Sequence, residues 1–126
     1  MKRLYIAYLL LILTALLCGF AYYLVTSNAK EMKSEMESVK ASAHAENYEL
    51  ASKQLDSIEK KWTERHKIFA VFCPHYDIHE IDITIIPLRS YLNSNTINDF
   101  YAYTDIVIAR LNHILENEIP SIENIF

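Results

Sequence analysis

The sequence predicts an all-α protein in which an N-terminal transmembrane helix and a stalk precede a small antiparallel helical bundle. Three observations support this fold class. Residues 4–25 include no charged residue. After them, apolar residues recur at three- and four-residue spacings, as on one face of an α-helix. Finally, the single glycine of the 126-residue chain is Gly19, so the rest of the chain has no glycine for tight hairpins and favours helices joined by short polar turns.

The uncharged segment, LYIAYLLLILTALLCGFAYYLV, is 22 residues long. As a helix it can cross a hydrocarbon core of about 30 Å at ~1.5 Å per residue. Four tyrosines lie near the two ends of this segment, where amphipathic rings favour the membrane–water interface: Tyr5, Tyr8, Tyr22 and Tyr23. The alternative is a cleaved secretory signal with SNA (27–29) as the cleavage site. Signal peptides have a shorter apolar core of roughly 7 to 15 residues, so we favour a retained anchor.

The flanking charges predict the orientation of the span. Lys2 and Arg3 precede it directly, whereas Lys30 is the first cation after it and is followed by Glu31. The positive-inside rule then leaves the N-terminus in the cytoplasm and the rest of the chain outside the cell membrane. We expect a transmembrane anchor at 1–28, a helical stalk at 29–46 and an extracytoplasmic helical domain at 47–126.

The charge balance excludes one class of partner. All 16 acidic residues and 10 of the 12 basic residues follow the span, so the exterior part has a formal charge of −6. Phosphate binding requires a basic face, and an acidic domain does not supply it, so we expect no nucleic-acid partner. The lipid bilayer is the expected partner, and an envelope protein is the further candidate. No cofactor is expected.

Two amphipathic patterns follow the span. In residues 26–46 the apolar stripe is thin and suits either a helix that pairs with another or a solvated connector; it consists of Met32, Met36, Val39 and Ala43. From Asn47, a candidate N-cap, a stronger pattern predicts a helix to about Cys73, where Pro74 stops it. Its stripe, expected in the core, is Ala51, Leu55, Ile58, Trp62, Phe69 and Phe72.

The third pattern crosses a proline. Its apolar positions are Ile78, Ile81, Ile85, Leu88 and Leu92. The β-branched run at 81–86 and Pro87, which costs an interior helix position about 3 kcal/mol, both oppose a helix. The spacing nevertheless continues without a phase break, which favours a kinked helix over a strand that would have no partner strand.

A last helix and an apolar tail complete the chain. Thr96 and Asp99 resemble a capping box, and the stripe that follows ends before Pro120: Phe100, Thr104, Val107, Leu111 and Ile114. The tail IPSIENIF is too apolar to be left free in water. It either closes the base of the bundle, which we favour, or binds a partner through Ile122, Ile125 and Phe126.

The stretch FCPHYDIHEIDI (72–83) raises the question of a metal site. His75 and His79 are four residues apart, the spacing by which two imidazoles on one helical face bind Zn²⁺, and Asp77 is a further candidate ligand. Asp77 projects to another face, however, and HEIDI is not the H-E-x-x-H motif of metalloproteases. A polar helix start, with Asp77 favoured by the helix macrodipole, is the better interpretation, so we assign no metal site.

Catalysis is not expected either. Cys73 with His75 or His66 would be a nucleophile–base pair, but no glycine-rich oxyanion loop accompanies it. Because Cys18 lies in the span, Cys73 is expected to be a buried thiol, with an intermolecular disulfide as the alternative. We therefore expect a membrane-anchored extracytoplasmic binding or scaffolding protein. The alternative is a metal-dependent envelope sensor or enzyme that uses the His75 and His79 region.

Several motifs together resemble a family of small, membrane-anchored helical proteins of Gram-positive, often spore-forming bacteria, known as a domain of unknown function. Besides the hydrophobic span, they are Y-x-x-A-x-x-x-L at 48–55, Trp62, H-x-[DE]-I at 75–78, L-[RK]-S-Y-L at 88–92 and S-[LI]-E-N-I-F at 121–126. The terminal motif is the most specific. Pro87 and Tyr48 depart from the family pattern. The resemblance implies the architecture above and leaves the activity open.

Overall fold

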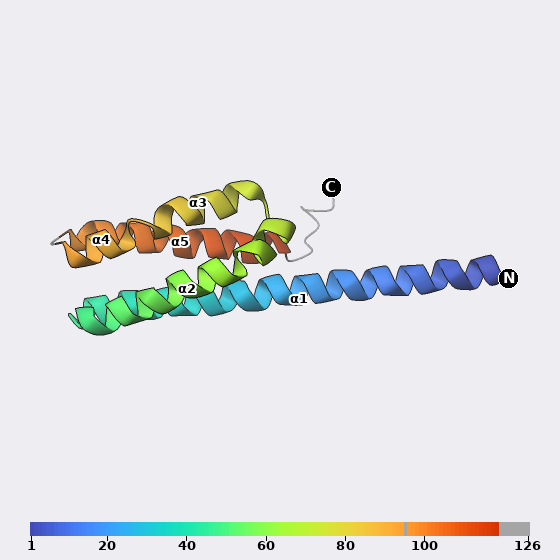
Figure 1. The fold of residues 1–126 in the computed structure, drawn as a ribbon, viewed down its shortest axis with the longest axis horizontal. Coiled ribbons are helices and arrows are strands. Elements are labelled where there is room, and N and C mark those ends of the chain that lie inside the picture. Colours follow the sequence, from blue (N-terminus) through green and yellow to red (C-terminus); the bar gives the residue numbers. More distant parts are fainter. Residues whose placement is uncertain (95, 119–126) are drawn as a thin grey trace.

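All secondary structure in the part of the chain that the structure describes is helical. The computed structural model describes residues 1–94 and 96–118. The helices are α1 (Lys2–His44), α2 (Tyr48–Phe72), α3 (His75–Ile85), α4 (Leu88–Asn93) and α5 (Ile97–Glu118). Figure 1 shows the second half of α1, α2, the α3–α4 pair and α5 lying side by side, with successive rods antiparallel. The predicted all-α class is confirmed for these residues.

Helix α1 has two halves with opposite surroundings. Its most apolar 18-residue window has a mean hydropathy of 2.4 and is wholly unburied, so the helix is long and apolar enough to cross a membrane. Figure 1 shows this half extending away from the other helices. The second half carries six buried residues: Val25, Ala29, Met32, Met36, Val39 and Ala43. A single unbroken helix therefore joins the apolar rod to the bundle.

The segment expected to be a stalk is a helix of the bundle. Its buried stripe begins at Val25, earlier than the sequence pattern indicated, and α1 packs against both α2 and α5. Of the two possibilities left open for residues 26–46, the structure shows the paired helix. The stripe is thin in the sequence because its small and flexible apolar residues are separated by polar and charged ones, yet five of its six members have no exposed surface.

The turn between α1 and α2 closes both helix ends with hydrogen bonds. The backbone N–H of Asn47 donates to the carbonyl of Ser42, and that of Glu46 donates to Ala43, each at 3.0 Å. This is a Schellman arrangement, and Glu46 has a φ of 59° at the position where glycine is usual. The side chain of Asn47 accepts from the N–H of Leu50 at 3.2 Å, which confirms the predicted N-cap.

The end of α2 agrees with the sequence prediction except for one ring. The helix ends at Phe72, Cys73 is extended and Pro74 follows. Trp62 and Phe69 are buried and stack with centroids 5.3 Å apart, but the expectation that Phe72 lies in the core was wrong, since it is 47% exposed. The reason is that the buried face at this end of α2 passes from Phe69 to Cys73, four residues on, so Phe72 projects beside that face. The expectation that Cys73 is buried is confirmed.

Pro87 interrupts the third pattern without changing its phase. Helix α3 ends at Ile85, and α4 begins at Leu88, while Ile86 and Pro87 both keep right-handed helical backbone angles. Ile85, Leu88 and Leu92 are all buried on the side facing α5 and α2. The third pattern thus forms two short helices with a kink between them, and their shared apolar face continues across the proline. The start of the last helix is also as predicted, since α5 begins at Ile97.

Ion pairs join the outer faces of α1 and α2. Lys61 donates to Glu31 at 3.0 Å and also to Glu35, and Arg65 donates to Glu31 at 2.7 Å. Arg65 and then Lys61 lower the pKa of the Glu31 carboxyl to about 2, although its side chain is 43% exposed. Such exposed pairs are screened by water and salt, so the network contributes modestly to stability.

This network predicts a loss of stability in acid. The lowered pKa of Glu31 gives a contribution that is complete above the usual carboxyl pKa of about 4.5 and is lost as the pH falls towards about 2. With screening, we expect Glu31→Gln to cost up to about 1 kcal/mol at pH 7 and almost nothing at pH 2. Thermal denaturation of the full chain in mild detergent, followed by circular dichroism from pH 2 to 7, measures the difference. In a Lys61→Met, Arg65→Met background the same substitution should have no effect at any pH; a cost that persists there would contradict the assignment.

Candidate functional site

The three weak metal candidates do not converge. His75 and His79 are exposed on α3, whereas Asp77 is buried towards α5. Across residues 1–94 and 96–118, no group of three or more His, Cys, Asp or Glu side chains is placed to hold a metal ion. The geometry of α3 accounts for this, since residues two apart on a helix project to different faces.

The buried Asp77 instead pairs with α5. Its side chain is 1% exposed, and both carboxylate oxygens lie 3.0 Å from Nδ1 of His113, whose own side chain is 49% exposed. The guanidinium of Arg110 lies 3.9 Å from Asp77. A buried carboxylate needs such partners because its desolvation is otherwise costly. Asp77 lies in the first turn of α3, so the macrodipole that the sequence suggested also favours its charge.

A second group of contacts lies beside this pair. Arg110 approaches Glu80 at 3.6 Å, and its guanidinium carbon lies 5.0 Å from the centroid of the Tyr76 ring, in cation–π geometry. Asn117 lies 3.3 Å from Nδ1 of His113. We call Tyr76, Asp77, Glu80, Arg110 and His113 the Asp77 cluster. Three members of the cluster come from α3 and two from α5. Their contacts join the start of α3 to the second half of α5.

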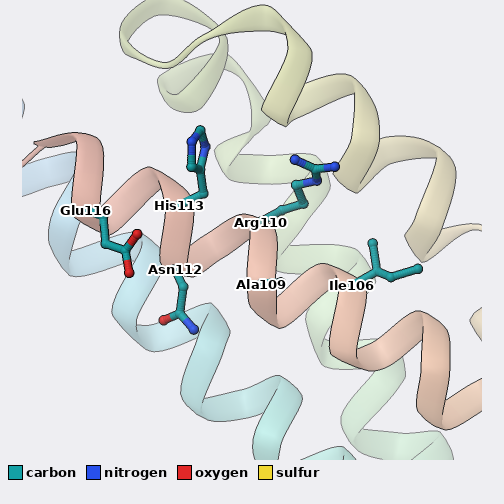
Figure 2. Close-up of a pocket in the computed structure, with 6 residues that line it drawn as sticks. All are labelled: Ile106, Ala109, Arg110, Asn112, His113 and Glu116. Carbon is teal, nitrogen blue, oxygen red and sulfur yellow. The ribbon is translucent and has the colours of Figure 1, made fainter.

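A shallow groove of about 500 Å³ runs along the outer face of α5 next to this cluster. Its lining residues are Ile106, Ala109, Arg110, Asn112, His113 and Glu116. Figure 2 shows Arg110 and His113 pointing towards α3, whereas Asn112 and Glu116 point to the opposite side of α5. All six come from one helix, so the groove follows a helix surface and does not enclose a small molecule.

The partners of Asp77 were not predicted from the sequence. Arg110 and His113 are three residues apart on the helix predicted after Thr96, and this spacing places them on one face. That signal shows only that they are neighbours. Their contact with α3 depends on how two helices pack, and the sequence pattern does not specify it.

His66, considered and not favoured as a general base for Cys73, contacts Asp82. Nε2 of His66 lies 3.1 Å from Oδ2 of Asp82, and the Trp62 indole N–H donates to Oδ1 of the same carboxylate at 2.7 Å. Trp62 and Asp82, but not His66, line a groove of about 370 Å³ between α2 and α3. The contacts of Asp82 therefore serve to join α3 to the aromatic core of α2.

The candidate partner-binding residues of the tail, Ile122, Ile125 and Phe126, lie outside the described residues. Their assignment as a partner-binding segment stays a prediction.

The fold and these contacts define a class: a small all-α protein in which one helix is an exposed apolar rod along its first half and part of a helical bundle along its second. The model of a family described as a domain of unknown function (DUF4363) matches residues 19–125. The chain belongs to this family, as the sequence motifs indicated. Searches of curated proteins and of solved structures each found no match.

Proposed function

We propose that the protein is a single-pass membrane protein whose helical bundle acts at the outer face of the cell membrane as a binding or scaffolding element, without catalysis of its own. The carrying observation is that α1 continues without interruption from the exposed apolar rod into the bundle core. A rigid connection of this kind fixes the position of the bundle relative to the bilayer, which suits a scaffold.

The burial of α1 also supports retention of the span. Cleavage after SNA (27–29) would cut within a continuous helix and remove Val25 and Ala29, which are completely buried. The matched family region begins at residue 19, inside the uncharged segment. Both observations favour an anchor over a cleaved signal.

The orientation is proposed from the flanking charges and is tested by cysteine labelling in whole cells. Cys73 is buried and therefore a poor reporter. In a Cys18→Ala background, Lys60→Cys on the exposed face of α2 should react with a membrane-impermeant thiol reagent, whereas Lys2→Cys should react only after the cells are opened. The parental Cys18→Ala chain controls for labelling of Cys73. The reverse pattern would overturn the orientation, and release of a chain lacking its first 29 residues would overturn the anchor.

A binding role is tested by crosslinking in vivo. We expect the full chain to capture one reproducible envelope protein. If a chain without residues 121–126 stays folded and loses that partner, the tail is the binding segment. If it unfolds, the tail is structural, and a chain that crosslinks to nothing would contradict the scaffold.

A further inference from the structure

Apolar side chains are exposed at the junction of α2 and α3. Val71 is 73% exposed, Phe72 is 47% exposed, and Tyr76 is 61% exposed. They lie within six successive residues that also include Pro74, at the point where the chain leaves α2 and enters α3. We call Val71, Phe72 and Tyr76 the apolar tip.

The apolar tip lies at the level of the end of the membrane span. The 25 residues of α2 extend about 37 Å, and α1 extends about 30 Å from Val25, the last residue of the uncharged segment, to His44, at ~1.5 Å per residue. The two helices meet at one turn and run antiparallel, so α2 reaches about 7 Å beyond Val25. Figure 1 shows the α2–α3 junction at the end of the bundle from which the first half of α1 extends.

The charges of the segment that carries the tip suit a membrane surface, although α5 adds an exposed carboxylate at this end, that of Glu116, one turn beyond His113. Between Glu64 and Asp77 there is no acidic residue, although the exterior part of the chain is acidic as a whole. Lys67, one turn before the tip, is exposed and can reach the headgroups through its long aliphatic stem. Tyr22 and Tyr23 of α1 are both exposed, and at ~1.5 Å per residue they fall within the roughly 7 Å by which α2 passes Val25.

We propose that the apolar tip inserts into the headgroup layer of the bilayer that holds the span, so that the bundle contacts the membrane at a second point. This inference rests on the proposed membrane anchoring. The bilayer is the expected occupant because the exposed apolar rod of α1 continues directly past the tip, and interfacial segments of this kind bury apolar side chains about 5–10 Å into the boundary of headgroups and acyl chains. A helix fixed at one point can tilt, and a second contact restrains it.

The test places single spin labels on the full chain in phosphatidylcholine–phosphatidylglycerol nanodiscs, in a Cys18→Ala, Cys73→Ala background. The label at Val71→Cys should be several-fold more accessible to oxygen than to a water-soluble nickel chelate. The matched control is Leu50→Cys, an exposed apolar residue of the same helix at its opposite end, and its label should show the opposite preference. Circular dichroism checks that each variant is folded.

A label at Leu13→Cys, within the uncharged segment, separates the two proposals. If the label at Leu13 is in lipid while the label at Val71 has the same accessibility as the label at Leu50, the anchor stands and the tip inference is wrong. If Leu13 itself is in water, both are wrong. Should the cysteine-free background not fold, the wild-type chain in nanodiscs with gadolinium-chelating lipids gives the same answer by NMR. The amides of Val71 and Phe72 should then broaden strongly and that of Leu50 should not; equal broadening overturns the inference.

Discussion

A chain of residues 47–126, the exterior domain expected from the sequence, lacks α1 and should show no cooperative unfolding transition. The buried face of α1 includes Val25, Met32, Met36 and Val39, all without exposed surface. Each fully buried apolar side chain of this size contributes about 1.5–3 kcal/mol. Because the net stability of a domain is only about 5–15 kcal/mol, loss of these residues and exposure of the α2 and α5 surfaces beneath them should remove it.

The matched control is a chain that begins at Leu24, which keeps the buried half of α1 and omits most of the span. It should unfold cooperatively in urea, as followed by circular dichroism. In that chain Met36→Ala should cost about 2–5 kcal/mol, whereas Ser34→Ala, on the exposed face of the same helix, should stay within about 0.5 kcal/mol. Cooperative folding of the shorter chain would mean that α1 is a connector and not part of the core.

Replacement of His113 should be the most destabilising change among the polar contacts. In His113→Ala, the carboxylate of Asp77 stays buried and loses its nearest partner, with only Arg110 at 3.9 Å remaining. Breaking a fully buried ion pair costs about 3–5 kcal/mol. Since His113 is half exposed, water can partly replace it, and we expect about 2 kcal/mol at neutral pH, measured by urea denaturation.

Two further variants test the cause of this loss. Asp77→Asn in the His113→Ala background should recover part of the stability, because a neutral amide is less costly to bury than a carboxylate. His79→Ala, an exposed histidine on the neighbouring helix, should stay within about 0.5 kcal/mol. If His79→Ala and His113→Ala had equal effects, the Asp77 cluster would not be a stabilising contact between α3 and α5.

The positions of the helices could be predicted well because their signals are local. The N-cap at Asn47, the stop at Pro74 and the break at Pro87 each depend on the backbone chemistry of one or two residues. The apolar spacing likewise identified most core positions. It failed at Phe72, because a spacing of three or four leaves both Phe72 and Cys73 as candidates after Phe69, and the packing of α2 buries Cys73.

The candidate site was less predictable. The pattern placed Asp77 at a helix start but could not pair it with Arg110 and His113, which are more than 30 residues away in the sequence. Spacing indicates which residues share a face of one helix. It does not indicate which face of a second helix packs against that face. This depends on the lengths of the turns and on the packing of the helices that lie between the two in the sequence.

By itself, then, the sequence determined the apolar span, the helical class, the family and most helix boundaries, because these follow from composition and from interactions between near neighbours in the chain. Only the tertiary structure decided that the segment after the uncharged residues is a core helix, that Asp77 is buried against α5, and that the α2–α3 junction lies at the end of the bundle from which the apolar half of α1 extends. All three depend on contacts between helices. The stabilising free energy of these contacts comes from burying apolar surfaces that are far apart in the sequence, and the spacing of residues within one helix does not indicate which surfaces meet.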